Sequence, residues 1–199
     1  ARDLGLEVAF RPYFRLHRDE RQVGLAPEVV APGDVIHCDV GISYLRLISD
    51  HQHVAYVTRR GESGPPDGLV TRMEETNRLQ DIFLAGFAHG RSGNEMLEAM
   101  LREARAADIA EPQIYSHNIG LFLHQPGPLI GLPWEQEPVL PRGNVRLEHD
   151  SAFVMELSTT GPVPEWGDQR HTLSLEEPVL FTGGTCQTVC ERQTAWHVL

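Results

Sequence analysis

The stretch AFVMELSTTGPVPEWGDQRHTLSLEEPVLFT, residues 152–182, decides the fold of this chain. Two apolar, strand-forming runs flank the turn-rich segment PVPEWGDQ. A hairpin centred on Trp166 would place Glu156 and Glu176 directly opposite each other on one face of a sheet. Like charges held face to face repel each other unless a cation lies between them. The stretch therefore predicts a hairpin that presents a cation-binding pair of carboxylates.

A second pair of carboxylates has a similar arrangement earlier in the chain. Asp39 lies in VIHCDVG and Asp50 in LISDHQH, with the turn-like GISY between them. A hairpin centred between Tyr44 and Leu45 would place Asp39 and Asp50 directly opposite each other, within about 5.5 Å. Together with His117, the two pairs make five side chains that can converge on one metal site.

The case for a metal site rests on these five residues together. Taken singly, an Asp at a strand end is usually a cap, a Glu beside a turn is usually solvated, and a His is usually a satisfied polar side chain. Three of them, Asp39, Glu156 and Glu176, adjoin strongly apolar strand residues, where an ionised carboxylate needs a partner or a metal. The set is rich in oxygen, has one imidazole and lacks the thiolates of structural zinc sites. Four carboxylates can bridge two divalent ions, and Mn, Co, Fe or Zn would fit.

Composition narrows the class of protein. The 199 residues are enough for one domain with a core, and no apolar run approaches the ~20 residues of a membrane span. The net charge of −11, without a basic stripe, argues against nucleic acid as a partner. All 17 basic residues are arginine, which excludes a Schiff-base lysine. Three cysteines make no disulfide framework, although a bridge between Cys186 and Cys190 stays open, and we expect a reducing, cytoplasmic setting.

The periodicity along the chain predicts an α+β fold with strands around a central helical pair. The expected elements are a strand over 7–16, a turn at 31–34, helices over about 69–88 and from the capping box Ser92-x-x-Glu95, and two short strands within 114–131. The proline-rich segment 126–150 is expected to be an ordered loop over the mouth of the site. We found no repeat and no domain boundary, so residues 1–199 are expected to form one domain.

Four further histidines lie near the candidate ligands in sequence. His124 follows His117 by seven residues, in LFLHQP, and is either a structural residue before a turn or a group beside the metals that hydrogen-bonds a substrate carbonyl. Period-2 alternation places His51 and His53 on the face opposite Asp50, which argues against ligation there. His37 is expected to share the face of Asp39.

Four strings and one spacing, in a fixed order, carry a family resemblance: PGDVIHCDVG, Asp50 eleven residues after Asp39, SHNIGLFLHQPGP, VMELS and SLEEPVLFT. They resemble the M24 metallopeptidases, which are the methionine aminopeptidase, aminopeptidase P, prolidase and creatinase group. The resemblance covers nearly the whole chain from about residue 30 onward. It implies the pita-bread fold, here as a catalytic domain without the family's early helices or the N-terminal domain of its proline-specific members.

The resemblance also implies a site and a reaction. It assigns two divalent ions sharing a hydroxide to five ligands, Asp39, Asp50, His117, Glu156 and the bridging Glu176. Glu156 would assist proton transfer, and His124 would steady the substrate carbonyl or the tetrahedral intermediate. The implied activity is hydrolysis of the N-terminal peptide bond of a peptide or of a dipeptide, closest in look to the Xaa-Pro peptidases. Homodimers are common in the family.

The chain departs from the family pattern at four positions around the ligands. Asn118 follows the ligand His where glycine is usual, and Gln125 stands where glutamate is common. Gln113 replaces a frequent His, and Ser174 replaces a frequent Arg. These changes leave the ligand set intact and leave the preference for proline peptides open. The alternatives are a metal-free, creatinase-like hydrolase and a non-catalytic module that binds a peptide or protein.

Overall fold

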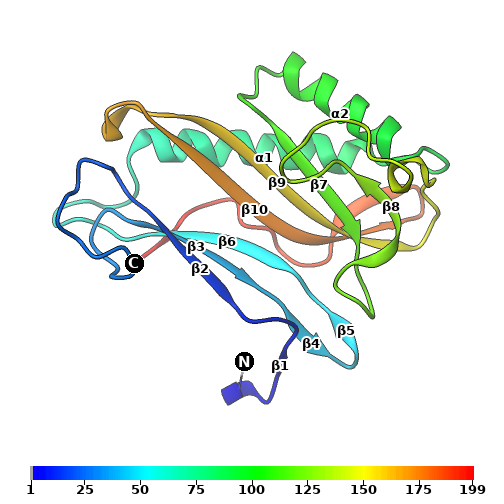
Figure 1. Ribbon diagram of the computed structural model, residues 1–199, viewed down its shortest axis with the longest axis horizontal. Coiled ribbons are helices and arrows are strands. Elements are labelled where there is room, and N and C mark those ends of the chain that lie inside the picture. Colours follow the sequence, from blue (N-terminus) through cyan, green and yellow to red (C-terminus); the bar gives the residue numbers. More distant parts are fainter. Residues whose placement is uncertain (1) are drawn as a thin grey trace.

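A strongly twisted antiparallel sheet forms the body of the molecule in the computed structural model, which describes residues 2–199 (Figure 1). Along its main path the strand order is β2-β3-β6-β10-β9-β7-β8, with β11 paired to β10 and β12 paired to β6. These strands are β2 (Tyr13–His17), β3 (Val35–Val40), β6 (His51–Tyr56), β7 (Gln113–Asn118), β8 (Gln125–Ile130), β9 (Ser151–Val163), β10 (Gln169–Thr182), β11 (Thr185–Thr188) and β12 (His197–Val198). With two helices on one face, the fold is α+β, as predicted.

The long hairpin of β9 and β10 is the centre of the sheet, and its predicted register is confirmed. The strands pair from Val163 and Gln169 at the turn to Ser151 and Phe181 at the far end. The turn contains the short 3-10 helix η3 (Pro164–Trp166), which ends at Gly167 with a φ of 68°. Glycine is favoured there because left-handed backbone is costly for other residues. Trp166 is therefore the centre of symmetry, as the sequence indicated.

Two helices cover one face of this hairpin. Helix α1 (Asp67–Gly86) begins and ends two residues before the predicted range, and α2 (Gly93–Ala106) begins after the predicted cap. The Ser92 side chain accepts a hydrogen bond from the Glu95 backbone, and the Glu95 carboxylate accepts one from the Ser92 backbone, so the capping box is confirmed. The helices and the inner face of the hairpin form the larger core cluster, which includes Phe83, Phe87, Met96, Met100, Phe153, Met155, Val179 and Phe181.

The N-terminal segment forms two short strands, so the single strand expected over 7–16 was wrong. Strand β1 (Glu7–Val8) joins a small separate sheet with β4 (Ile42–Tyr44) and β5 (Leu47–Ile48), in the order β1-β4-β5. Strand β2 instead pairs with β3, with Tyr13 opposite Asp39. The break falls at Pro12, which has no N–H to donate to a strand partner.

The proline-rich segment after β7 is only partly the loop that was expected. Pro126 and Pro128 lie within β8, at the edge of the sheet. The loop that follows contains η2 (Arg142–Asn144) and packs on α2, where the Asn94 amide bonds both the Val139 carbonyl and the Asn144 side chain. The loop is ordered, as expected, but much of it covers the helix rather than the candidate ligands.

The predicted turn at residues 31–34 is confirmed by a hydrogen bond from the Asp34 backbone to the Ala31 carbonyl. The three cysteines, Cys38, Cys186 and Cys190, are free thiols. Among the described residues, no helix combines the length and the apolar character needed to cross a membrane.

Candidate metal centre

One row of side chains crosses five strands on the face of the sheet away from the helices. Asp39 on β3 pairs with Gln52 on β6, and Gln52 pairs with Glu176 on β10. Glu176 pairs with Glu156 on β9, and Glu156 pairs with Tyr115 on β7. Directly opposite residues in antiparallel strands point to the same face. The register therefore aligns three of the predicted ligands in one continuous row.

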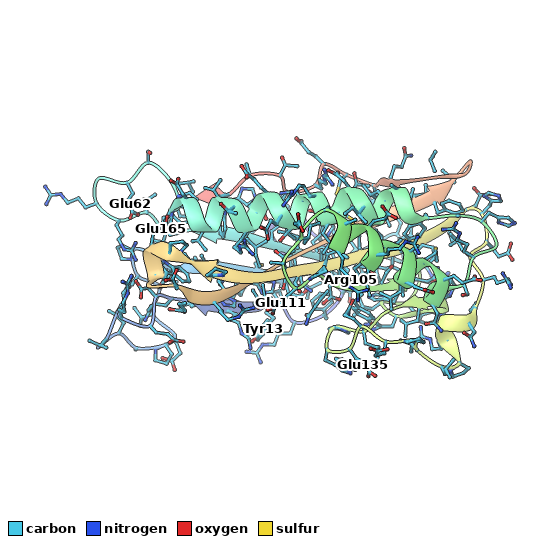
Figure 2. The ribbon with its side chains drawn as sticks, turned by 90° about the horizontal axis from the view of Figure 1, so that it is seen from above. Tyr13, Glu62, Arg105, Glu111, Glu135 and Glu165 are labelled. Atoms are coloured by element: carbon cyan, nitrogen blue, oxygen red, sulfur yellow. The ribbon has the colours of Figure 1, made fainter. Side chains whose placement is uncertain are left out.

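Tyr13 on β2 extends this row by one strand, because it pairs with Asp39. Its labelled side chain lies on the side of the sheet away from α1 (Figure 2). The row is thus on the face that the two helices leave uncovered. The core face of the same hairpin carries the neighbouring residues Met155 and Leu157 instead.

The other two predicted ligands lie beside the row and close to each other. Asp50 immediately precedes β6, two residues before Gln52, and His117 on β7 is two residues beyond Tyr115. The distance from His117 Nε2 to Asp50 Oδ2 is 3.9 Å. Ligand atoms of Asp50, His117 and Glu176 all lie within 4.8 Å of one another, and all three side chains are buried. These three residues form a candidate metal-binding group by distance alone.

The predicted register of the first hairpin was wrong by one residue at its turn. The turn is at Leu45 and Arg46, whose φ angles of 50° and 70° match a tight hairpin turn with two left-handed residues. Asp39 consequently pairs with Gln52 rather than with Asp50. A shift of the turn by one residue changes the pairing by two, so Asp50 stays on the predicted face, diagonal to Asp39.

The carboxylates of this site raise one another's pKa. Burial is the largest cause for each, and neighbouring negative charges add to it. The pKa of Asp50 rises to about 7 and that of Glu156 to about 6, while the pKa of Glu176 lies well above its usual value. Burial likewise raises the pKa of Asp39. A cation between these groups would remove the repulsion and favour their charged forms.

Two further observations fit a site built for cations. Asp39 Oδ1 is buried and has no hydrogen-bond partner. Within residues 2–199, no arginine forms an ion pair with any of the four carboxylates, and the basic group nearest to Asp50 is the His117 imidazole at 3.9 Å. Burial lowers the pKa of His117 to about 4, which keeps the imidazole neutral, the form that binds metals. The donor set therefore fits hard or borderline divalent ions.

His124 lies beside His117 at the edge of the sheet. Its ring centroid is 4.3 Å from that of His117, and it immediately precedes β8 at the edge of the sheet. The side chain is exposed, so a substrate could reach it while the neighbouring His117 stays buried.

Two members of the row, Gln52 and Tyr115, were not predicted from the sequence. Gln52 Oε1 accepts a hydrogen bond from His37 Nε2 at 2.9 Å, which confirms that His37 shares the face of Asp39. Tyr115 lies next to Glu156, and burial, followed by that carboxylate, raises its pKa to about 12. Both residues are two positions from a predicted ligand, so strand alternation alone could have indicated them.

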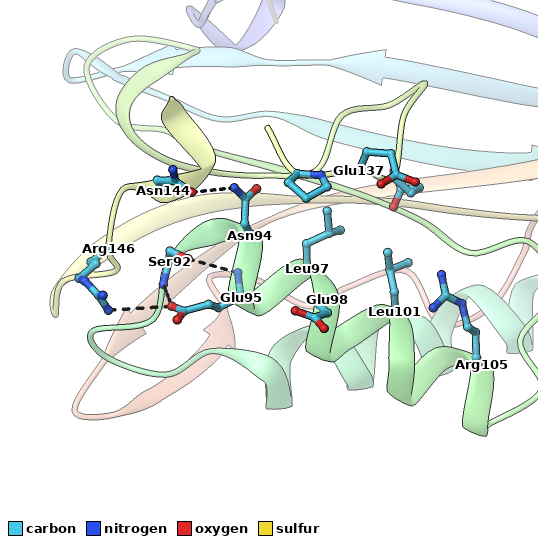
Figure 3. A pocket seen from close by; sticks show the side chains of 12 residues that line it. Ser92, Asn94, Glu95, Leu97, Glu98, Leu101, Arg105, Glu137, Asn144 and Arg146 are labelled. Atoms are coloured by element: carbon cyan, nitrogen blue, oxygen red, sulfur yellow. Dashed lines mark hydrogen bonds and ion pairs between the residues drawn. The ribbon is translucent and has the colours of Figure 1, made fainter. Parts of the chain in front are cut away.

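The cavities near the site differ in size and place. A cavity of about 100 Å³ beside Glu156 is lined by Tyr115, Gln113 and Ser174, so two of the four departures from the family pattern face it. A larger cavity, about 580 Å³, lies elsewhere, between α2 and the loop after β8 (Figure 3). None of the five predicted ligands lines that larger cavity.

The twisted sheet, with two helices on one face and the carboxylate row on the other, is the pita-bread fold. The family model for metallopeptidase family M24 matches residues 5–182, and the chain belongs to this family. A comparison with curated proteins found no match.

Solved structures with this fold include several peptidases. The X-Pro aminopeptidase from Thermotoga maritima has a TM-score of 0.68 and 21% identity over 96% of this chain and 50% of its own. The Xaa-Pro dipeptidase from Bacillus anthracis has a TM-score of 0.66 and 19% identity over 96% and 49%. The N-terminal domain of FACT complex subunit SPT16 from Cicer arietinum (chickpea) has a TM-score of 0.63 and 14% identity over 96% and 43%. The chain thus spans about half the length of these structures, and at such identities the likeness shows the fold.

Proposed function

We propose that this domain is a metal-dependent peptidase that hydrolyses the N-terminal peptide bond of peptides or a dipeptide. The observation that carries the proposal is the convergence of four carboxylates and one neutral imidazole on the open face of the sheet. Asp50, His117 and Glu176 come within 4.8 Å of one another, and Asp39 and Glu156 flank them in the register. A structural role for so many buried negative charges would require cationic partners that the described residues do not supply.

We assign the ligands of two divalent ions, Mn, Co, Fe or Zn, to Asp39, Asp50, His117, Glu156 and Glu176. When bound, such a pair of ions supplies an activated water at neutral pH and polarises a carbonyl group. Glu176 would be placed to contact both ions, because it is 2% exposed and its pKa is raised by burial and then by the charges of Glu156, Asp50 and Asp39.

Two side chains would handle the substrate and its protons. Glu156 is less deeply buried than Glu176 and has a pKa near 6, so it can hold and return a proton close to neutral pH. His124 is exposed beside His117, where it can donate a hydrogen bond to the carbonyl oxygen of a peptide as negative charge develops there.

An Xaa-Pro substrate is the finer part of the proposal, and it is supported by the similarity to an X-Pro aminopeptidase and an Xaa-Pro dipeptidase. The small cavity beside Glu156 presents Gln113 and Ser174 where the family often has a His and an Arg. Neutral polar side chains there would bind a substrate through hydrogen bonds rather than through a charge. The substrate preference of this chain would then differ from that of typical Xaa-Pro peptidases.

The second candidate is a module that binds a peptide or protein without cleaving it, and it is supported by the similar fold of the N-terminal domain of a FACT complex subunit. A creatinase-like hydrolase without metal is the third. The cytoplasmic setting and the homodimer stay predictions.

Metal content separates these candidates. The chain is loaded with manganese or cobalt, desalted and analysed for bound metal, alongside Asp50→Ala and the control Glu98→Gln, which changes an exposed carboxylate on α2. The metallopeptidase proposal predicts two ions in the native chain and the control, a sharp loss in Asp50→Ala, and metal-dependent cleavage of an N-terminal residue from a peptide library. Metal-independent turnover would favour the creatinase-like enzyme. Peptide binding without cleavage at full metal loading would favour the binding module.

A further inference from the structure

A second group of ligand-type side chains lies on the opposite face of β6 and β10. Strand alternation places His51 and His53 on the face away from Asp50, and it places Glu177 on the face away from Glu176. Cys190, from the segment after β11, meets them there. Ligand atoms of His51, Glu177 and Cys190 all lie within 4.8 Å of one another.

Glu177 is a buried carboxylate with hydrogen bonds to only one of its two oxygens. Its side chain is fully buried, and Oε1 accepts hydrogen bonds from His53 Nε2 at 2.8 Å and from the Gln193 backbone N–H at 3.0 Å. The other oxygen, Oε2, is buried and has no hydrogen-bond partner. It lies 3.9 Å from His51 Nε2. A buried carboxylate with one unpartnered oxygen is costly unless a cation or a donor meets that oxygen.

The distances between these three ligand atoms match those in the tetrahedral coordination of a metal ion. With zinc bonds of about 2.0–2.3 Å to nitrogen, oxygen and sulfur, neighbouring ligand atoms are separated by about 3.3–3.6 Å. The distance from Cys190 Sγ to His51 Nε2 is 3.5 Å, and that from His51 Nε2 to Glu177 Oε2 is 3.9 Å. Small side-chain movements would therefore seat an ion among the three atoms.

The same geometry argues against a nucleophilic cysteine triad. In such a triad the thiol and the carboxylate contact opposite nitrogens of the imidazole. Here Cys190 and Glu177 both approach Nε2 of His51. Because the thiol and the carboxylate both face Nε2 of His51, an ion could contact all three atoms. The arrangement does not allow the imidazole to pass a proton between the thiol and the carboxylate.

Cys190 is held in place even though its side chain is exposed. The segment that follows it is tied down by Arg192, which pairs with Asp81 on α1 at 2.6 Å. The Gln193 amide bonds the backbone of Val54 on β6, and Trp196 Nε1 donates to the Leu69 carbonyl. The exposed thiol gives an ion a route from solvent, and the anchors fix the distance of the thiol from β6.

We propose that His51, Glu177 and Cys190 bind one zinc-class ion that fastens the C-terminal segment to the helix-side face of the sheet. Imidazole, carboxylate and thiolate suit a borderline ion such as Zn²⁺, and water completes the tetrahedron. Binding replaces the proton on Cys190 Sγ, which leaves to solvent. His53 is a positioning residue, because its hydrogen bond fixes the Glu177 carboxylate. The inference is independent of the proposed peptidase activity, because no ligand is shared.

Cobalt substitution tests the site in the intact chain, under reducing conditions. A cobalt–thiolate charge-transfer band in the near ultraviolet reports Cys190, because the five proposed peptidase ligands include no thiol. We expect one equivalent of the bound cobalt to give this band and zinc to abolish it. Cys190→Ser should lose the band, whereas the control Cys186→Ser and the peptidase-site variant Glu156→Gln should retain it.

Two further variants keep the test decisive. His51→Gln, at a partly exposed position, should weaken the band without unfolding the chain, as checked by circular dichroism. His53→Gln should keep the band but weaken cobalt binding by about ten- to hundredfold. Absence of the band from the folded native chain, or its persistence in Cys190→Ser, would overturn the proposal. Metal in the peptidase site alone would show as bound cobalt without a thiolate band.

Discussion

Replacing Asp50 by asparagine should stabilise the metal-free protein at alkaline pH, although Asp50 is a buried polar residue with a proposed function. Asp50 is 6% exposed, and its carboxyl group has a pKa of about 7 in the folded chain, against 3.8 as the ordinary value. Burial is the main cause, and the charges of Asp39 and Glu156 add to it. The folded state therefore holds this proton more tightly than the unfolded state does.

The sign and size follow from proton linkage. Between about pH 4 and pH 7 the folded protein binds more protons than the unfolded protein, so its stability falls as the pH rises through this window. A pKa difference of about three units, at about 1.4 kcal/mol for each, gives a loss of about 4 kcal/mol above pH 7. The neutral asparagine avoids this cost, so Asp50→Asn should gain up to about 4 kcal/mol over the native chain in that range.

The assay is urea denaturation in the presence of a chelator, at about pH 4.5 and about pH 8, for the native chain, Asp50→Asn and the control Glu98→Gln. The free energy of unfolding of Asp50→Asn should increase relative to that of the native chain as the pH rises. The free energy of unfolding of the control, relative to the native chain, should not change with pH. An excess of manganese should then narrow the difference between Asp50→Asn and the native chain at about pH 8, because the native chain gains about 2.7 kcal/mol at a hundredfold excess over its Kd. If Asp50→Asn is destabilised equally at both pH values, the repulsion argument is refuted.

Three other substitutions test the proposed chemistry and the fold. His124→Ala should lower kcat by about 10²- to 10³-fold and leave bound metal unchanged, as checked by elemental analysis, and loss of metal would make it a ligand instead. Phe153→Ala should cost about 3–5 kcal/mol in urea denaturation because its ring is fully buried under the helices, and a cost below about 1 kcal/mol would contradict the packing. Ser92→Ala should cost about 1 kcal/mol through loss of the capping box, with Ser92→Asp as the restoring control, and no difference between the two would contradict the cap.

The two hairpins differ in how well the sequence predicts the register of their strands. The turn of β9 and β10 contains prolines and Gly167, which is in a left-handed conformation, so the centre of the turn could be predicted from the sequence. Glu156 pairs with Glu176, as predicted. The turn between β4 and β5 uses Leu45 and Arg46, which carry no signal for left-handed backbone. The pairing of Asp39 was therefore predicted two residues away from where it lies.

The face of the sheet on which each ligand lies could be predicted even where the residue paired with it on the next strand could not. Alternation along a strand fixes the side on which a residue lies, so Asp50, His51 and His53 were assigned to the correct faces. The same rule could have indicated Gln52 and Tyr115, because each is two residues from a predicted ligand. Their polar side chains carry no chemical signal until the neighbouring strands are known.

The sequence by itself determined the family, the α+β class, the capping box of α2 and the order of the candidate ligands along the chain. These depend on local propensity and on alternation, whose physical range is a few residues. Only the tertiary structure decided that β7 lies beside β9 and brings His117 to Asp50. It alone placed Cys190 against His51 and Glu177. Such contacts join segments far apart in sequence, and they are set by the packing of the whole sheet against its helices rather than by any local pattern.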